Sequence, residues 1–182
     1  MIRCNLSVLM AERGLKISRV ASDTKLSRTT LTALANNYSQ GIQLDTLNTL
    51  CMYLNTTPEK LITFYPVDFK IVSFLLQGAL DYYHMTFEMV LNIIKLKRSV
   101  TCPVLVNAEC FYDDNCPCFN ITVSPVWPED TETNETTELL SQELSSIPVP
   151  FKSDLENSIF KEICTEWLEH NEPVLNSFTW EI

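Results

Sequence analysis

The spacing of apolar residues changes along the chain, and this change predicts two domains. In the first part, leucines recur three or four positions apart, which is the period of a helix buried along one face. In the second part, apolar and polar residues alternate: from Met85 to Ile93 the odd positions are apolar and the even positions mostly polar. Such alternation is typical of a half-buried strand. We expect a helical domain over residues 1–65, a hinge at 66–68 and a sheet-containing domain over residues 69–182.

Short helices with clear start and stop signals fill the first domain. A helix from about Leu6 to Arg13 is followed by Gly14, a common residue just beyond a helix end. Leucines at helical spacing predict a further helix over Leu44 to Leu54. We expect Thr57 to cap a last helix, with Pro58 at its first position, where the missing N–H costs nothing.

Between these helices, residues 14–34 have the pattern of a helix, a tight turn and a second helix. Ser27 is placed to cap the second helix, because its hydroxyl can accept a free backbone N–H. Leu31 and Leu34 would hold that helix on the core. The outward positions are short or polar, as on a recognition helix that enters the major groove. They are Arg28, Thr29, Thr32, Ala33 and Asn36.

This stretch resembles the helix-turn-helix of the Cro/C1 repressor family, also called the XRE family. The residues that fill the family pattern are Gly14, Leu15, Val20, Ala21, Leu26, Ser27, Leu31 and Leu34. The resemblance covers residues 1–65 and implies an all-α, five-helix DNA-binding domain. Two positions depart from the pattern. Ile17 stands where the family often has a Gln that contacts a phosphate, and Lys25 replaces the usual turn glycine, so Lys25 should carry a positive φ.

The outward positions and the resemblance together predict the DNA-contacting residues. In the family, the loop after the recognition helix passes along the DNA backbone, so its polar side chains could donate to phosphates. A solvated turn is the alternative for each of them. The predicted contacts are Lys16, Ile17, Ser18, Lys25, Ser27, Arg28, Thr29, Thr32, Ala33, Asn36, Asn37 and Ser39.

The net charge of −10 is unusual for a DNA-binding protein, but the charge is unevenly distributed. Residues 1–66 hold seven basic and four acidic side chains, a net charge of +3, and the remainder carries −13. The basic share lies where phosphate contacts would need it. The acidic part should be repelled by DNA and must face away from it.

The second domain is predicted to be α+β, with a mostly antiparallel sheet and one main helix. A capping box of Ser153 and Glu156 begins the helix, which runs to His170. Residues 128–150 are acidic and rich in Thr, which predicts a solvated loop with at most a short helix near Thr137 to Leu144. The predicted strands cover Phe69–Leu76, Met85–Ile93, Val100–Asn107, Glu109–Tyr112, Cys118–Val126 and Val174–Ile182.

Three further features of this domain concern a possible helix, a turn and the surface used for self-association. Phe69 to Tyr83 could instead form a helix, because its apolar residues do not alternate strictly. Asp113-Asp114-Asn115 predicts a hairpin turn. The helix stripe that includes Phe160, Trp167 and Leu168 could serve only to cover the sheet. The alternative is that part of this stripe, or the terminal strand at Phe178 to Ile182, meets its copy across a two-fold axis.

The chain has seven cysteines, four of them close together in the sequence: Cys102, Cys110, Cys116 and Cys118. An odd number of cysteines argues against a disulfide scaffold. A zinc site is the sharper interpretation, but Cys116-Pro117-Cys118 lacks the two-residue spacer of a zinc knuckle. Redox sensing is a further alternative, and buried small apolar side chains are the default.

Little in the sequence indicates catalysis. Neither His84 nor His170 has a recognisable set of catalytic partners, and the chain has no glycine-rich phosphate loop. We therefore expect no enzyme, no cofactor and no bound metal. The absence of a signal peptide and of a long apolar run predicts a cytoplasmic protein that avoids membranes.

Two functions fit these features. The first is a transcriptional regulator that binds double-stranded DNA, a phage- or mobile-element-like repressor acting as a homodimer. The second is an antitoxin or sensing regulator whose acidic second domain binds a protein partner or a small ligand. The sequence does not choose between repressor, activator and antitoxin.

Overall fold

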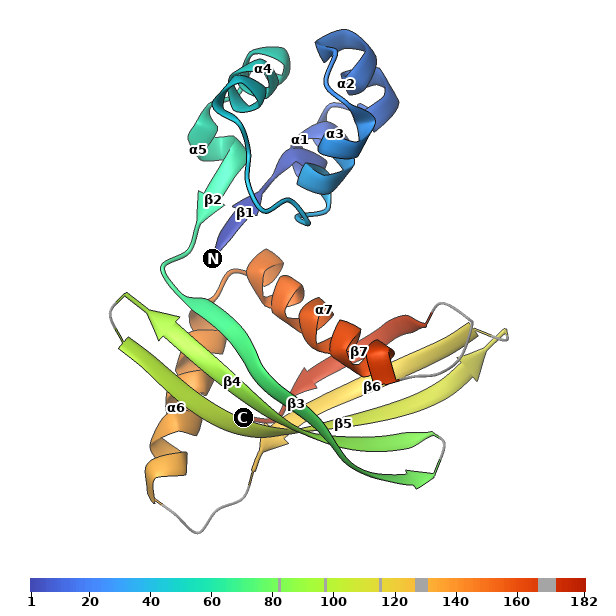
Figure 1. Ribbon diagram of the computed structural model, residues 1–182, viewed down its shortest axis with the longest axis vertical. Coiled ribbons are helices and arrows are strands. Elements are labelled where there is room, and N and C mark those ends of the chain that lie inside the picture. Colours follow the sequence, from blue (N-terminus) through green and yellow to red (C-terminus); the bar gives the residue numbers. More distant parts are fainter. Residues whose placement is uncertain (82, 97, 115, 127–130, 167–172) are drawn as a thin grey trace. The chain divides into compact units, whose positions relative to one another are not determined.

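The computed structural model describes residues 1–81, 83–96, 98–114, 116–126, 131–166 and 173–182. The chain divides into two compact units, Met1–Tyr65 and Pro66–Ile182 (Figure 1). Among the described residues, no helix has both the length and the apolar character needed to cross a bilayer.

The first unit is helical and packs around a small leucine core. Its helices are α1 (Leu6–Glu12), α2 (Ile17–Thr24), α3 (Arg28–Ala35), α4 (Leu44–Leu54) and α5 (Pro58–Leu61). Each helix except α2 contributes at least one leucine to this core, and α2 contributes Val20. Pro58 occupies the first turn of α5, but the Thr57 side chain makes no capping hydrogen bond, so its expected capping role is wrong.

A two-stranded ribbon, which no pattern in the sequence predicted, closes this unit. Strand β1 (Ile2–Cys4) pairs antiparallel with β2 (Ile62–Phe64), with Cys4 opposite Ile62. The Met1 amino group donates to the Tyr65 carbonyl at 2.7 Å, and the Tyr65 N–H donates to the Met1 carbonyl at 2.9 Å. Three residues per strand are too few to show an alternating pattern.

The second unit is built on a five-stranded sheet in the order β3-β4-β5-β6-β7. Its first four strands, all antiparallel, are β3 (Asp68–Asp81), β4 (His84–Lys95), β5 (Arg98–Asp113) and β6 (Cys116–Pro125). Strand β7 (Val174–Trp180) runs parallel to β6. The sheet is therefore mixed, which corrects the expectation of a mostly antiparallel sheet. The parallel pair arises because two helices connect β6 to β7, and such a crossover returns the chain to the same end of the sheet.

Three predictions about the strands are corrected or only partly tested. The helical alternative for Phe69 to Tyr83 is wrong, because β3 covers most of that stretch. The two strands expected at Val100–Asn107 and Glu109–Tyr112 are one continuous strand, β5, with buried Ala108 at their junction. The predicted turn at Asp113-Asp114-Asn115 includes Asn115, which lies outside the described residues.

The connection between β6 and β7 contains two helices in place of the expected acidic loop and single helix. Helix α6 (Thr131–Ser146) buries Leu140 and Leu144, one helical turn apart, and packs against β5. The prediction of a loop over residues 128–150 is therefore wrong for most of its length, whereas the short helix expected near Thr137 to Leu144 lies within α6. Two leucines at this spacing suffice to anchor an otherwise polar helix. Residues 127–130 lie outside the description.

Helix α7 (Val149–Glu166) lies across one face of the sheet (Figure 1). It begins four residues before the predicted start, so Ser153 and Glu156 lie within the helix and form no capping box. Glu156 instead accepts a hydrogen bond from the Trp180 indole N–H of β7 at 3.0 Å. The predicted contacts of Trp167 and Leu168 fall on residues 167–172, outside the described residues.

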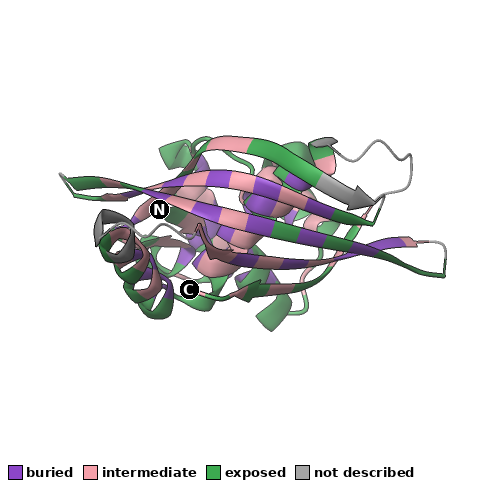
Figure 2. Ribbon diagram, turned by 90° about the horizontal axis from the view of Figure 1, so that it is seen from below, coloured by how far each residue is buried: buried purple, intermediate pink, exposed green. Residues whose placement is uncertain are grey.

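Alternating side chains along the strands form the core of this unit. Figure 2 shows the alternation as successive buried and less buried segments. The helices α6 and α7 contribute their buried apolar residues to this core. The opposite face carries polar pairs: for example, the Gln77 side chain donates a hydrogen bond to the Glu88 carboxylate at 2.6 Å. Residues of the core that are fully or almost fully buried include Phe87, Met89, Leu91, Val104, Val106, Phe119, Ile121, Leu140 and Ile159.

Candidate DNA-binding surface

The turn between α2 and α3 is fixed by local hydrogen bonds. The Ser27 hydroxyl accepts the Thr30 N–H at 3.0 Å, which confirms the predicted cap, and it also contacts the Thr30 hydroxyl at 2.8 Å. Lys25 has a φ of 63°, which confirms that it takes the left-handed conformation usually given to glycine. The Leu26 N–H donates to the Thr24 hydroxyl at 3.3 Å. These contacts set the angle at which α3 leaves the turn.

Helix α3 presents one face to the core and the opposite face to solvent. Leu31, Leu34 and Ala35 are buried, and Leu31 is completely inaccessible. Thr29, Thr32 and Asn36 are exposed, and Ala33 is half-buried beside them. With 100° between successive residues, these four lie on the side opposite the buried residues. The core contacts thus leave this ridge, defined by Thr29, Thr32, Ala33 and Asn36, available to a ligand.

Three exposed cations precede this ridge in the sequence: Lys16, Lys25 and Arg28. Within the described parts of the chain, their side chains make no ion pair or hydrogen bond. A phosphate can therefore bind them without breaking an internal contact, and each such contact would release counterions from DNA.

Arg19, in contrast, is engaged within the unit. Its Nε lies 2.7 Å from Asp23 Oδ2, which also accepts the Tyr53 hydroxyl at 2.8 Å. This hydrogen bond to Asp23 raises the pKa of Tyr53 above its usual value. Asp23 thus links α2 to α4.

The start of α2 holds two further predicted contacts, Ile17 and Ser18, beside Lys16. Lys16 and Ser18 are exposed, whereas the Ile17 side chain packs partly against the leucine core. Ile17 therefore cannot replace the phosphate-binding Gln of the family through its side chain. The first N–H groups of a helix have no intrahelical acceptor, so the backbone here is suited to an anion.

In the loop after α3, two of the predicted phosphate contacts already make hydrogen bonds within the unit. The Asn37 side chain binds the backbone of Cys4 through both its oxygen and its nitrogen. The Ser39 hydroxyl donates to the Gly41 carbonyl at 2.5 Å. As phosphate contacts, Asn37 and Ser39 stay predictions, since both side chains already have partners within the unit. Asn37 has a φ of 58°, a conformation that Asn tolerates better than most residues. An asparagine just after the helix was therefore the sequence signal for a structural role.

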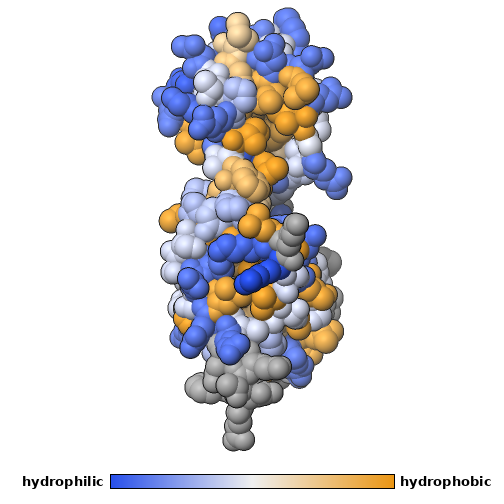
Figure 3. Space-filling model, turned by 90° about the vertical axis from the view of Figure 1, so that its left-hand side faces the viewer, coloured by the Kyte–Doolittle hydropathy of each residue, from blue (hydrophilic) through white to orange (hydrophobic). Residues whose placement is uncertain are grey.

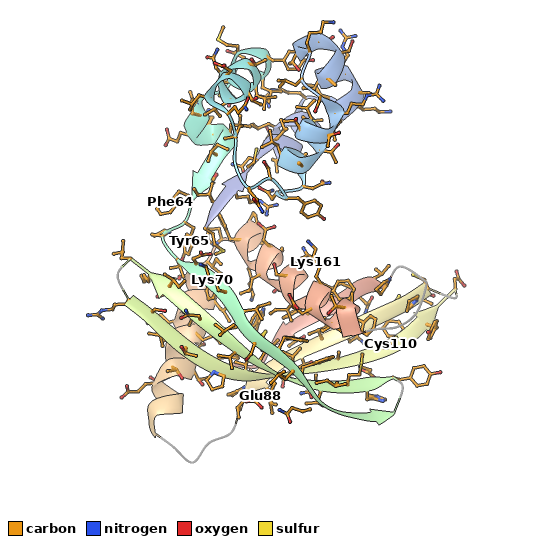
Figure 4. The ribbon with its side chains drawn as sticks, in the orientation of Figure 1. Phe64, Tyr65, Lys70, Glu88, Cys110 and Lys161 are labelled. Atoms are coloured by element: carbon orange, nitrogen blue, oxygen red, sulfur yellow. The ribbon has the colours of Figure 1, made fainter. Side chains whose placement is uncertain are left out.

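The four clustered cysteines lie on strands β5 and β6. Cys102 and Cys110 lie eight residues apart on the single strand β5, about 26 Å at the usual rise. Cys110 lies toward one end of the sheet (Figure 4). Across the described residues, no group of three potential ligands is found. Burial raises the pKa of the Cys102 and Cys118 thiols, which makes them weak ligands and weak nucleophiles.

Comparison with known proteins bears on the first unit alone. Residues 5–66 match the family model of the Cro/C1-type HTH DNA-binding domain, and the C-terminal region matches no family model. No curated protein matches the chain. The match spans α1 to α5, including the capped turn, the buried face of α3 and the exposed ridge. Residues 5–66 of this chain therefore form a Cro/C1-type helix-turn-helix DNA-binding domain, as carried by DNA-binding regulators.

Proposed function

We propose that the protein is a sequence-specific transcriptional repressor of the phage or mobile-element type, which binds its operator as a homodimer. The observation that carries this proposal is the ridge of α3, which is anchored by buried leucines and has Arg28 beside it. The matched family supports DNA as the ligand. Thr29, Thr32 and Ala33 of the ridge would read base edges. Asn36 and the cations Lys16, Lys25 and Arg28 would bind phosphates or, for Arg28, a base.

The dimer follows from the small size of the reading helix. Helix α3 has eight residues and reaches only a few base pairs, so two copies on half-sites about one helical turn apart would supply the missing affinity. Both units expose apolar side chains that a two-fold interface could bury. In the first unit, Ile2 and Phe64 pair across the ribbon at 72% and 68% exposure. Apolar patches are visible on the face drawn in Figure 3.

The second unit supplies a second candidate function. Its net charge of −13 favours a basic protein partner, as expected for an antitoxin that covers a basic toxin. The same charge would repel DNA, so both functions leave DNA binding to the first unit.

Selection of duplexes from a randomised pool by the full chain tests the proposal. We expect a nearly palindromic operator, bound at least about 10³-fold more tightly than an unrelated duplex at the same salt concentration. Arg28→Ala should weaken operator binding by about 1–3 kcal/mol. The matched control is Arg98→Ala, which removes an exposed arginine of the acidic unit and should bind as the wild type. Absence of any selected duplex, or equal loss in both variants, would contradict the proposal.

A further inference from the structure

The ridge of α3 has a distinctive chemistry: it carries methyl groups, two hydroxyls and the Asn36 amide, but no charge. Thr29, Thr32 and Ala33 are separated by three and four positions, so their methyl groups form one continuous strip along the helix. Arg28 lies at the first position of the helix, about 100° away from Thr29 around the axis. The only cation of α3 is thus at the side of the strip.

The hydroxyls of Thr29 and Thr32 differ from those of other threonines in the first unit in their hydrogen bonding. Thr24 and Thr49 donate to carbonyls four residues earlier, at 2.7 and 2.8 Å. The Thr30 hydroxyl is held by Ser27. No hydrogen bond of the Thr29 or Thr32 hydroxyl is found among the described residues. Both groups of these two side chains, methyl and hydroxyl, are therefore available to a ligand.

The edges of the four bases place different demands on such a surface. Guanine is read best by Arg or Lys, and cytosine by an acidic acceptor, and the strip offers neither. The thymine C5-methyl group is the apolar feature of the major groove, and it packs against Ala and the methyl group of Thr. An uncharged strip with three methyl groups therefore complements thymine better than any other base.

We propose that Thr29, Thr32 and Ala33 recognise thymine methyl groups, so that the centre of each operator half-site consists of A·T pairs. Arg28 contacts the flank of this segment. This inference rests on the proposed function, since it assigns base preference to the same helix.

Deoxyuridine tests the inference directly, because it lacks only the C5-methyl group of thymine. In the selected operator, each thymine is replaced singly by deoxyuridine, and binding is measured with the full chain. We expect about a fourfold loss of affinity at each contacted position, the effect of leaving roughly one methyl group unburied. Full replacement should multiply these losses.

Serine variants identify the side chain that reads each methyl group. Thr32→Ser keeps the hydroxyl and removes the methyl group, so it should bind the thymine operator about fourfold more weakly. It should also lose the discrimination between thymine and deoxyuridine at one position. Thr30→Ser is the matched control, since the Thr30 hydroxyl is bound to Ser27 and its side chain lies off the strip. This control should discriminate as the wild type does.

Tight binding of an operator in which full deoxyuridine replacement leaves the affinity unchanged would overturn the inference. Selected half-sites made of G·C pairs would also overturn it. In both cases the proposed function stands, because a specific duplex is bound. Failure to select any duplex would instead overturn the proposed function itself and this inference with it.

Discussion

Asn37 and Cys4 are joined by two hydrogen bonds that tie the end of the recognition helix to the first strand. Asn37 Oδ1 accepts the Cys4 N–H at 2.7 Å, and Asn37 Nδ2 donates to the Cys4 carbonyl at 3.2 Å. The Asn37 amide thus satisfies both backbone groups of Cys4, as a residue of a neighbouring strand would. Because β1 pairs with β2, this contact connects α3 to both ends of the first unit.

Asn37→Ala should destabilise the first unit by about 1–3 kcal/mol, because it leaves the partly buried Cys4 amide groups without partners. Alanine is also less suited than asparagine to the φ of 58° at this position. The measurement is urea unfolding followed by far-ultraviolet circular dichroism. Tryptophan fluorescence reports the second unit separately, because all three tryptophans lie beyond residue 66.

The neighbouring Asn36→Ala is the control for this prediction. Asn36 is exposed and its side chain has no partner among the described residues, so unfolding should change by less than about 0.5 kcal/mol. If Asn36 contacts phosphate, its variant should weaken binding to all duplexes alike. Equal unfolding midpoints for both variants would show that the Asn37–Cys4 contact contributes nothing to stability.

Lys25→Gly should affect stability and DNA binding in opposite directions. The left-handed conformation costs a residue with a Cβ atom roughly 1–2 kcal/mol, so glycine should raise the free energy of unfolding by a part of that. Loss of the cation should reduce the slope of log affinity against log salt by about 0.9 if Lys25 contacts one phosphate. Unfolding and binding titrations at several salt concentrations measure both effects. A variant that is less stable than the wild type would contradict the conformational explanation.

An ion pair between Lys95 and Glu143 should stabilise the second unit. Lys95 Nζ lies 2.7 Å from Glu143 Oε1, and Glu143 is only 3% exposed. Lys95→Met should destabilise the unit by about 1–3 kcal/mol, since a buried carboxylate loses its partner. The Lys95 side chain is half exposed, so the lower end of this range is expected.

The double variant Lys95→Met/Glu143→Leu should recover most of that loss, because no charge is then left buried. Lys70→Met, on an exposed lysine of β3, should leave the unfolding of the unit unchanged. Tryptophan fluorescence in urea follows all three variants. A double variant that is less stable than Lys95→Met would show that Glu143 has other essential contacts.

The fragment Met1–Pro66 should fold by itself, because its helices share one core and the β1–β2 ribbon joins its ends. It should bind the operator more weakly than the full chain, since the second unit is expected to supply self-association. Sedimentation and binding of the two proteins on the same duplex test this expectation. A fragment that binds a palindromic operator as tightly as the full chain would place the dimer interface in the first unit.

The sequence predicted the elements whose signals are local. Ser27 and Leu31 mark the start and the buried face of α3, and both marks depend on residues within one helical turn. The ribbon was missed because Cys4 and Ile62 are distant in sequence and their strands are short. Only a short part of helix α6, near Thr137 to Leu144, was predicted, because acidic and Thr residues outweigh Leu140 and Leu144 in composition, although these two leucines are the buried residues of that part.

The candidate DNA-binding residues also divide into those that local sequence patterns predict and those that depend on distant contacts. The exposed ridge was predictable, since a helical period divides buried from outward positions. The double contact of Asn37 and the hydrogen bond from Tyr53 to Asp23 depend on the tertiary structure. The parallel direction of β7 depends on the path of two helices, which no alternating pattern encodes.

The central claim is that DNA contacts are confined to the first unit and centred on α3. Its most direct test is a titration of the isotopically labelled full chain with the selected duplex, followed by amide chemical shifts. We predict the largest changes over Arg28 to Asn36 and over Lys16 to Ser18, with residues beyond Pro66 changing little unless they lie in the dimer interface. Largest changes in the strands of the second unit, with α3 unaffected, would contradict this account.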